Sequence, residues 1–200
     1  FGFNSSFNGP AGLENFKGEL SGFIRHTLEQ KYNGKSAPGL AIVSPTAFED
    51  VSDIDDSPDA VLTNQHLALY TDAMKEVCSE HGVPFIDVFS PSKAAFNTNK
   101  EPFTRDGALL NDKGYQWLAP QLADGLYGKS ANKNSKHRKQ VHAAVNEKNW
   151  CWLNDYKMPN GVQIYGRRGG GKNAPPQNYR DEYKKTREMT ALRDQAIWLA

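Results

Sequence analysis

Leu40-Ala41-Ile42-Val43-Ser44-Pro45 is the stretch of sequence that decides the expected fold. Four apolar residues in a row are typical of a strand that is buried on both faces, and Ser44-Pro45 ends it. A second apolar run, residues 83–89, predicts another strand. Apolar residues recur at helical spacing in residues 13–31, before the first strand, and in residues 58–80, between the two strands. Strands that alternate with helices predict a parallel sheet with helices on both faces.

Further helices are expected beyond the second strand. A loop through residues 100–111 leads to a helix over residues 112–126, in which leucines recur on one side. Two more amphipathic helices are predicted near residues 136–156 and 177–198.

The charge divides into an acidic part and a basic part. Residues 1–128 contain 9 Lys and Arg against 17 Asp and Glu, a net charge of −8. Residues 129–200 contain 15 against 6, a net charge of +9. We therefore divide the chain into a domain over 1–128 and a basic helical extension over 129–200. The near cancellation favours an extension that lies on its own acidic body, with an acidic partner or an anionic polymer as alternatives.

The first residues, Phe1-Gly2-Phe3-Asn4, have the appearance of a buried strand that ends in a functional loop. The side-chain amide of Asn4 can donate a hydrogen bond to a developing oxyanion, and Gly2 allows a close approach of backbone. On this interpretation the chain begins inside a catalytic domain. The alternative is an ordinary turn, in which asparagine is common.

Asp106 is a carboxylate in a loop that follows a strand and precedes a helix. A hydrolase keeps there the aspartate that orients a catalytic histidine. In a parallel sheet such loops meet at the carboxyl ends of the strands, so Asn4 and Asp106 are expected at one edge. The alternative is again a turn, because Asp106-Gly107 is a strong turn dipeptide.

Other motifs fall short of a site, so we expect no cofactor and no bound metal. Residues 166–172 nearly match a phosphate loop, but Asn173 replaces the required Ser or Thr and Pro175-Pro176 oppose a helix. The acidic residues 48–59 lack the spacing of a calcium loop. No apolar run of about 18 residues is present, so we expect no membrane span. Residues 129–139 contain no aromatic side chain for base stacking, so nucleic-acid binding is not expected.

Taken together, Gly2-Phe3-Asn4, the segment Gly82-Val83-Pro84-Phe85-Ile86-Asp87 and the segment from Asp106 to Tyr115 resemble the SGNH/GDSL esterase family. The likeness covers residues 1–128 and is greatest to a bacterial subgroup that occurs in larger multidomain proteins. It implies a flavodoxin-like three-layer α/β/α sandwich with a parallel sheet whose N-terminal strands are missing here. It also implies an exported, periplasmic protein with further domains in its parent.

The same resemblance implies hydrolysis of a carboxylic ester through an acyl-serine, with a small ester or an acetylated saccharide as substrate. By position, Asn4 is the oxyanion-hole asparagine, Gly2 supports its loop and Asp106 is the aspartate of the triad.

Two departures from the family pattern limit this reading. The blocks that carry the nucleophilic serine and the oxyanion glycine are not in this chain, and Leu109 stands where the family has its histidine. Leucine cannot accept a proton from serine, and we do not expect His66 or His81 to replace it. The chain alone is therefore expected to be inactive as an esterase. The alternatives are an SGNH-like binding or scaffold module without catalysis, and anionic-polymer binding by the basic extension.

Overall fold

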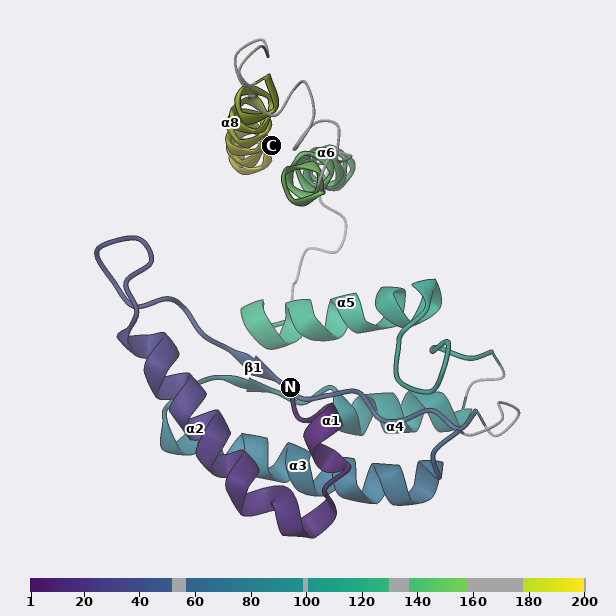
Figure 1. Cartoon of the computed structure of the whole chain (residues 1–200). Coiled ribbons are helices and arrows are strands. Elements are labelled where there is room, and N and C mark those ends of the chain that lie inside the picture. The colour runs from purple at the N-terminus through teal and green to yellow at the C-terminus, as the bar shows by residue number, and fades with distance from the viewer. Residues whose placement is uncertain (52–56, 99–100, 130–136, 158–177, 200) are drawn as a thin grey trace, which may run out of the picture. The chain divides into compact units, whose positions relative to one another are not determined.

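The computed structural model describes residues 1–51, 57–98, 101–129, 137–157 and 178–199 (Figure 1). The chain divides into two units, Phe1–Ser130 and Ala131–Ala200.

Helices dominate the first unit. Its elements are α1 (Phe3–Ser6), the 3₁₀ helix η1 (Gly9–Gly12), α2 (Leu13–Glu29), β1 (Ile42–Val43), α3 (Ala60–Glu80), β2 (Phe85–Ile86), α4 (Phe89–Thr98) and α5 (Asp112–Tyr127). The helices predicted over 13–31, 58–80 and 112–126 are confirmed as α2, α3 and α5. The two strands also lie inside the predicted runs, but each is only two residues long.

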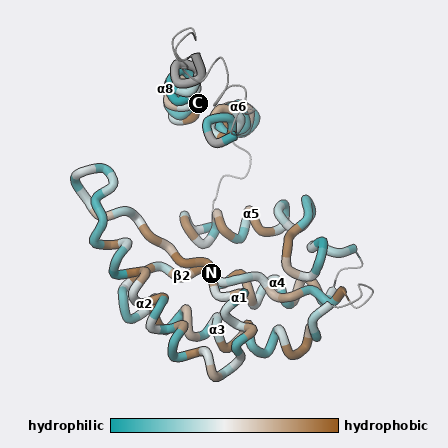
Figure 2. Tube along the Cα trace, viewed as in Figure 1, coloured by the Kyte–Doolittle hydropathy of each residue, from teal (hydrophilic) through white to brown (hydrophobic). Residues whose placement is uncertain are grey.

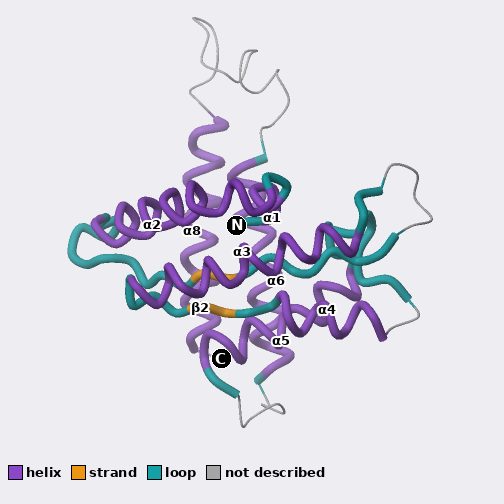
Figure 3. Tube along the Cα trace, turned by 90° about the horizontal axis from the view of Figure 1, so that it is seen from below, coloured by secondary structure: helices purple, strands orange, loops and turns teal. Residues whose placement is uncertain are grey.

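The expected flavodoxin-like α/β/α sandwich is wrong. The structure is 67% helical, and the only sheet in its described part is a two-stranded parallel pair, with Ile42 opposite Phe85 and Val43 opposite Ile86 (Figure 3). Helices α2 and α3 lie on one side of the pair and α5 on the other (Figure 1). The chain around the strands is hydrophobic, as the sequence indicated (Figure 2). However, a two-stranded pair does not constitute the sheet of that fold.

The strands are short because the backbone that follows each strand is hydrogen-bonded by side chains and not by a further strand. The buried Ser44 hydroxyl accepts the N–H groups of Val88 and Phe89 at 2.9 and 3.0 Å, where α4 begins. Past Ser44, Ala47 donates its N–H to Ser92 Oγ at 2.7 Å. Buried backbone groups need partners, and these side chains supply them without a ladder.

The next buried residues, Ala47, Phe48 and Glu49, are held in the same way. The Asn64 side chain accepts the N–H of Phe48 and donates to its carbonyl, both at 2.8 Å. The N–H of Glu49 donates to the Gly107 carbonyl at 2.9 Å. This extended segment therefore lies inside the unit without belonging to a sheet.

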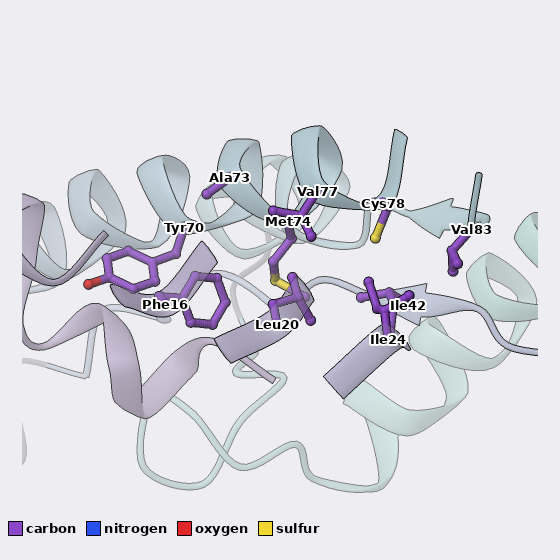
Figure 4. Close-up of a cluster of buried hydrophobic side chains, with 10 residues drawn as sticks. All are labelled: Phe16, Leu20, Ile24, Ile42, Tyr70, Ala73, Met74, Val77, Cys78 and Val83. Atoms are coloured by element: carbon purple, nitrogen blue, oxygen red, sulfur yellow. The ribbon is translucent and has the colours of Figure 1, made fainter. Parts of the chain in front are cut away.

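The main core of the first unit lies between α2, α3 and β1 (Figure 4). Leu20 and Ile24 of α2 and Met74 of α3 are completely buried, and Ile42 of β1 joins them. Tyr70 packs its ring on Phe16 and donates its hydroxyl to the Gly9 carbonyl at 3.0 Å. A second cluster joins the remaining elements and consists of Ala47, Phe48, Leu67, Phe89, Phe96, Phe103 and Leu110.

Among its described residues the second unit contains two helices, α6 (Arg138–Tyr156) and α8 (Asn178–Leu199), close to the predicted 136–156 and 177–198. They run antiparallel, because the later residue of α6, Asp155, pairs with the earlier residue of α8, Arg187. Three ion pairs join them: Lys148 with Asp194, Arg193 with Glu147 and Arg187 with Asp155. Cys151 and Thr190 are buried in this unit.

No helix in the described ranges is both long enough and apolar enough to cross a membrane.

Candidate functional site

Asp106 lies at the tip of a tight loop between α4 and α5. Thr104 and Leu110 form an antiparallel bridge at the base of this loop. The N–H of Arg105 donates to the Leu109 carbonyl at 2.8 Å, which narrows the tip to residues 106–108. We call residues 103–110 the Asp106 loop.

The Asp106 carboxylate stabilises the turn at the tip of the loop. Its Oδ1 accepts the N–H of Ala108 at 3.0 Å and the N–H of Leu109 at 2.7 Å. These two hydrogen bonds, from Leu109 first and then Ala108, hold the pKa of the Asp106 carboxyl below its ordinary value because they favour the charged form. The side chain remains exposed. Asp106 therefore fills the role of a turn former, which was the alternative interpretation, and its catalytic role stays a prediction.

A buried carboxylate that sequence reasoning missed, Glu49, anchors the base of the loop. Glu49 accepts the N–H of Phe103 on Oε1 at 2.9 Å and on Oε2 at 3.0 Å. Its Oε2 also accepts the N–H and hydroxyl of Thr104, at 2.7 and 2.5 Å. The sequence placed Glu49 in a solvated acidic segment, although its apolar neighbours Ala47 and Phe48 were a signal of burial.

Phe48 packs on both segments that carry predicted site residues. On one side its ring stacks on Phe3 of α1, with centroids 6.3 Å apart. On the other it lies against Gly107, whose φ is +88° and where a Cβ would come within 2.4 Å of Phe48 Cζ. The structure thus brings the segments of Asn4 and Asp106 onto one aromatic ring.

Asn4 and Gly2 have a different setting from the one expected. Gly2 is the N-cap of α1, with φ +85°, so the expected strand end is wrong. A Cβ on Gly2 would lie 3.2 Å from Met74 Sδ, so a side chain, rather than the expected backbone, lies close to Gly2. Asn4 lies in α1 with its side chain exposed, and no hydrogen bond joins it to Asp106 in the part of the chain that the structure describes.

Leu109 stands beside Asp106 with 64% of its surface exposed. Neither histidine considered as a replacement contacts it. The His66 ring lies against Gly9, 3.3 Å from the position of a Cβ there. His81 Nε2 is hydrogen-bonded to Ser21 Oγ at 2.7 Å. The described loop therefore offers no imidazole next to Asp106.

An open cavity of about 460 Å³ adjoins the loop at the start of α5. It is lined by Glu101, Pro102, Arg105, Asn111, Asp112 and Lys113. Lys113 lies over the Phe103 ring at 4.6 Å and donates to Glu101 Oε2 at 3.3 Å. The Asn111 side chain accepts the N–H of Gly114 and donates to the Pro102 carbonyl, so it serves the fold.

Among the described residues, no group of three or more His, Cys, Asp or Glu is arranged to hold a metal ion. Residues 166–173, with the near-match to a phosphate loop, lie outside the described residues.

Comparisons with family models, with curated proteins and with solved structures find no match for this chain. The likeness to the SGNH/GDSL esterases therefore rests on the quoted residues alone.

Proposed function

We propose that residues 1–128 act as an SGNH-like binding module that recognises an ester or acetylated saccharide without hydrolysing it. The observation that carries the proposal is the packing of Phe48 between Phe3 and Gly107. This packing draws together the two segments whose sequences resemble the family's site.

Leu109 is the reason that we expect no hydrolysis. General acid–base catalysis needs a group that takes and returns a proton at the reacting atoms. An exposed leucine next to Asp106 cannot do so, and the Asp106 carboxylate is held by two backbone N–H groups in the turn. Triad removals leave only the contributions of binding and of an oxyanion hole, about 10³–10⁴-fold over water.

Asn4 is the residue that we expect to bind the ligand. Its exposed side-chain amide can donate a hydrogen bond to the carbonyl oxygen of an acetyl group, and it has no hydrogen-bond partner in the described ranges. A single such bond contributes about 0.5–1.5 kcal/mol, so we expect weak binding that depends on further contacts with the rest of the ligand.

The test compares hydrolysis and binding in the natural full-length protein. Hydrolysis of p-nitrophenyl acetate is measured for two variants that both carry Ser21→Ala, one that keeps Leu109 and one with Leu109→His. Ser21→Ala removes a hydroxyl that lies outside this site. Binding of an acetylated xylo-oligosaccharide is followed by NMR, with Asn4→Ala as the test variant and Asn15→Ala as the control. Asn15 is exposed on α2 and bonds only Glu19 among the described residues.

We expect no hydrolysis above background in the variant that keeps Leu109. We expect binding to be lost in Asn4→Ala but not in Asn15→Ala. A rise in hydrolysis in Leu109→His would agree with a site that has lost only its base. If the variant that keeps Leu109 hydrolyses the ester at the rates of ordinary esterases, residues 1–128 act as an esterase and not as a binding module. If Asn4→Ala leaves binding unchanged, the proposed binding role is wrong.

A second candidate, anionic-polymer binding by the α6–α8 pair, is favoured by its exposed surface. Trp150 and Trp198 are 63% and 84% exposed within this unit, and Lys184 and Lys185 are exposed as well. Residues 129–139 contain no aromatic side chain for stacking, but these two exposed tryptophans of α6 and α8 belong to the same unit as the exposed lysines.

Retention of residues 137–199 on heparin tests this candidate, provided circular dichroism first shows that this segment is helical alone. Retention should fall steeply with salt if phosphate-like or sulfate groups are bound, because counterions are released. A helical segment that passes through heparin unretained at low salt excludes this function.

A further inference from the structure

Ser21 and His81 face each other between α2 and α3. Ser21 lies in the middle of α2, and His81 directly follows α3 as its C-cap. Ser21 Oγ is 2.7 Å from His81 Nε2, and both residues are half-buried. A serine hydroxyl bonded to an imidazole nitrogen is the arrangement in which the ring can take the hydroxyl proton.

The space around the pair is open. Gly18 and Gly22 lie on α2 within one turn of Ser21, and Gly82 follows His81. A Cβ at any of these three glycines would meet no atom within 4 Å. A small molecule can therefore approach the hydroxyl without displacing a side chain at these positions.

A cation lies one turn from the hydroxyl. Lys17 and Ser21 are four residues apart and so share a face of α2. The Lys17 Nζ is 2.7 Å from Glu76 Oε2, which holds it at the same α2–α3 contact as the Ser21–His81 hydrogen bond. Lys17 also lies 3.7 Å from Glu14 Oε1, so two carboxylates share its positive charge.

We propose that Ser21 and His81 form a nucleophile–base pair that reacts with small activated acyl or phosphonyl compounds. With a fluorophosphonate, Ser21 Oγ forms the bond to phosphorus as the P–F bond breaks and fluoride leaves. The hydroxyl proton passes to His81 Nε2 and from there to water. The ring must carry its own proton on Nδ1 for this transfer.

The requirement for an activated compound follows from the position of Ser21 in α2. The backbone N–H groups around Ser21 are bonded within the helix and are not directed at a reacting oxygen. The site therefore lacks the donors that stabilise an oxyanion in efficient hydrolases. A good leaving group, such as fluoride or p-nitrophenolate, compensates for that lack. The pair is independent of Asn4 and Asp106.

The experiment treats the full 200-residue chain with an alkyl fluorophosphonate and locates the adduct by tandem mass spectrometry. We expect the adduct on Ser21, its loss in Ser21→Ala, and labelling slowed by about 100-fold or more in His81→Gln, the range of general base catalysis. Ser90→Ala is the matched control, because Ser90 Oγ is also hydrogen-bonded, but to the Asp87 carboxylate at 2.6 Å rather than to an imidazole.

A chemical rescue separates a base from a merely structural contact. His81→Gly should recover labelling of Ser21 as imidazole is added, whereas Ser21→Ala should not respond. The native chain alone also decides the matter, since Ser21 must be labelled faster than Ser90. Equal labelling of the two serines in the native chain, or labelling that His81→Gln and imidazole leave unchanged, overturns the proposal.

Discussion

The Phe48 ring lies against Gly107 so closely that a Cβ on Gly107 would come within 2.4 Å of Phe48 Cζ. Gly107 has φ +88°, a conformation that side chains with a Cβ disfavour, and its carbonyl accepts the N–H of Glu49. Because Phe48 also stacks on Phe3, this one contact couples the Asp106 loop to α1.

Gly107→Ala should destabilise the first unit by about 2–4 kcal/mol, since it combines overpacking against Phe48 with backbone strain. Urea unfolding measures the change. Gly34→Ala is the control: φ there is +73°, but a Cβ would meet nothing within 4 Å, so only about 1 kcal/mol of strain is expected. Equal losses in the two variants would show that the Phe48 contact is unimportant.

Glu49→Gln should cost about 2–4 kcal/mol, because a charged acceptor of buried N–H and hydroxyl groups becomes a neutral amide that must turn an NH₂ group toward donors. Chemical denaturation and hydrogen exchange of the Phe103 and Thr104 amides measure the effect. Glu101→Gln removes an exposed ion pair with Lys113 and should change stability by at most about 1 kcal/mol. Unchanged protection of the two amides in Glu49→Gln would contradict the anchoring role.

Leu20→Ala should destabilise the first unit by about 2–5 kcal/mol, because Leu20 is completely buried between α2 and α3 and its removal leaves a cavity. Leu109→Ala, at an exposed leucine, should stay within about 0.5 kcal/mol of the native chain. Thermal unfolding of both variants is the measurement. A comparable loss in Leu109→Ala would mean that Leu109 is covered in solution.

Acid should weaken the Asp106 turn. The lowered pKa of Asp106 means that its stabilising contribution is present above the unfolded pKa of about 3.9 and is lost as pH falls through the folded pKa. The effect on stability is small because the carboxylate is exposed and solvent-screened. Carbon-13 NMR titration should give an Asp106 pKa below that of unfolded aspartate, and Asp106→Asn should flatten the acid limb of the stability curve. A titration at the unfolded value would contradict the two hydrogen bonds.

Helices α2, α3 and α5 were predictable because their signals are local. Apolar residues at helical spacing mark the buried face of α2, and Gly82 follows the end of α3 as a C-terminal glycine does. Asn111 caps α5 by accepting the N–H of Gly114 at 3.0 Å, an arrangement that sequence position alone favours.

Helix α4 and the short strands were not predictable because their determinants are distant in the sequence. The N–H groups at the start of α4 are bonded by Ser44, some 45 residues earlier. Asp87 also contributes, by accepting the N–H of Ser90 at 3.0 Å, and the dipeptide Ser90-Pro91 was an overlooked local sign of a helix start. Residues 83–89 were predicted as one strand, because burial was visible in the sequence and bonding partners were not, but only Phe85–Ile86 pair and α4 begins at Phe89.

Some features of the candidate site were likewise predictable from the local sequence, and others were not. Asp106-Gly107 was recognisable as a turn, and Leu109 as a residue without acid–base chemistry. The burial of Glu49 and the packing of Phe48 on both Phe3 and Gly107 were not recognisable, because each depends on segments about 45 to 60 residues apart meeting in space.

The sequence by itself determined that α2, α3, α5, α6 and α8 are helices, where the charge changes sign and that no imidazole follows Asp106 in its loop. Those properties depend on side chains a few residues apart. Only the tertiary structure decided that two apolar runs meet as a two-residue parallel pair, that Glu49 is a buried anchor and that Ser21 meets His81. Hydrogen bonds and packing between distant segments select these outcomes, and a buried polar group accepts whichever partner the fold brings to it.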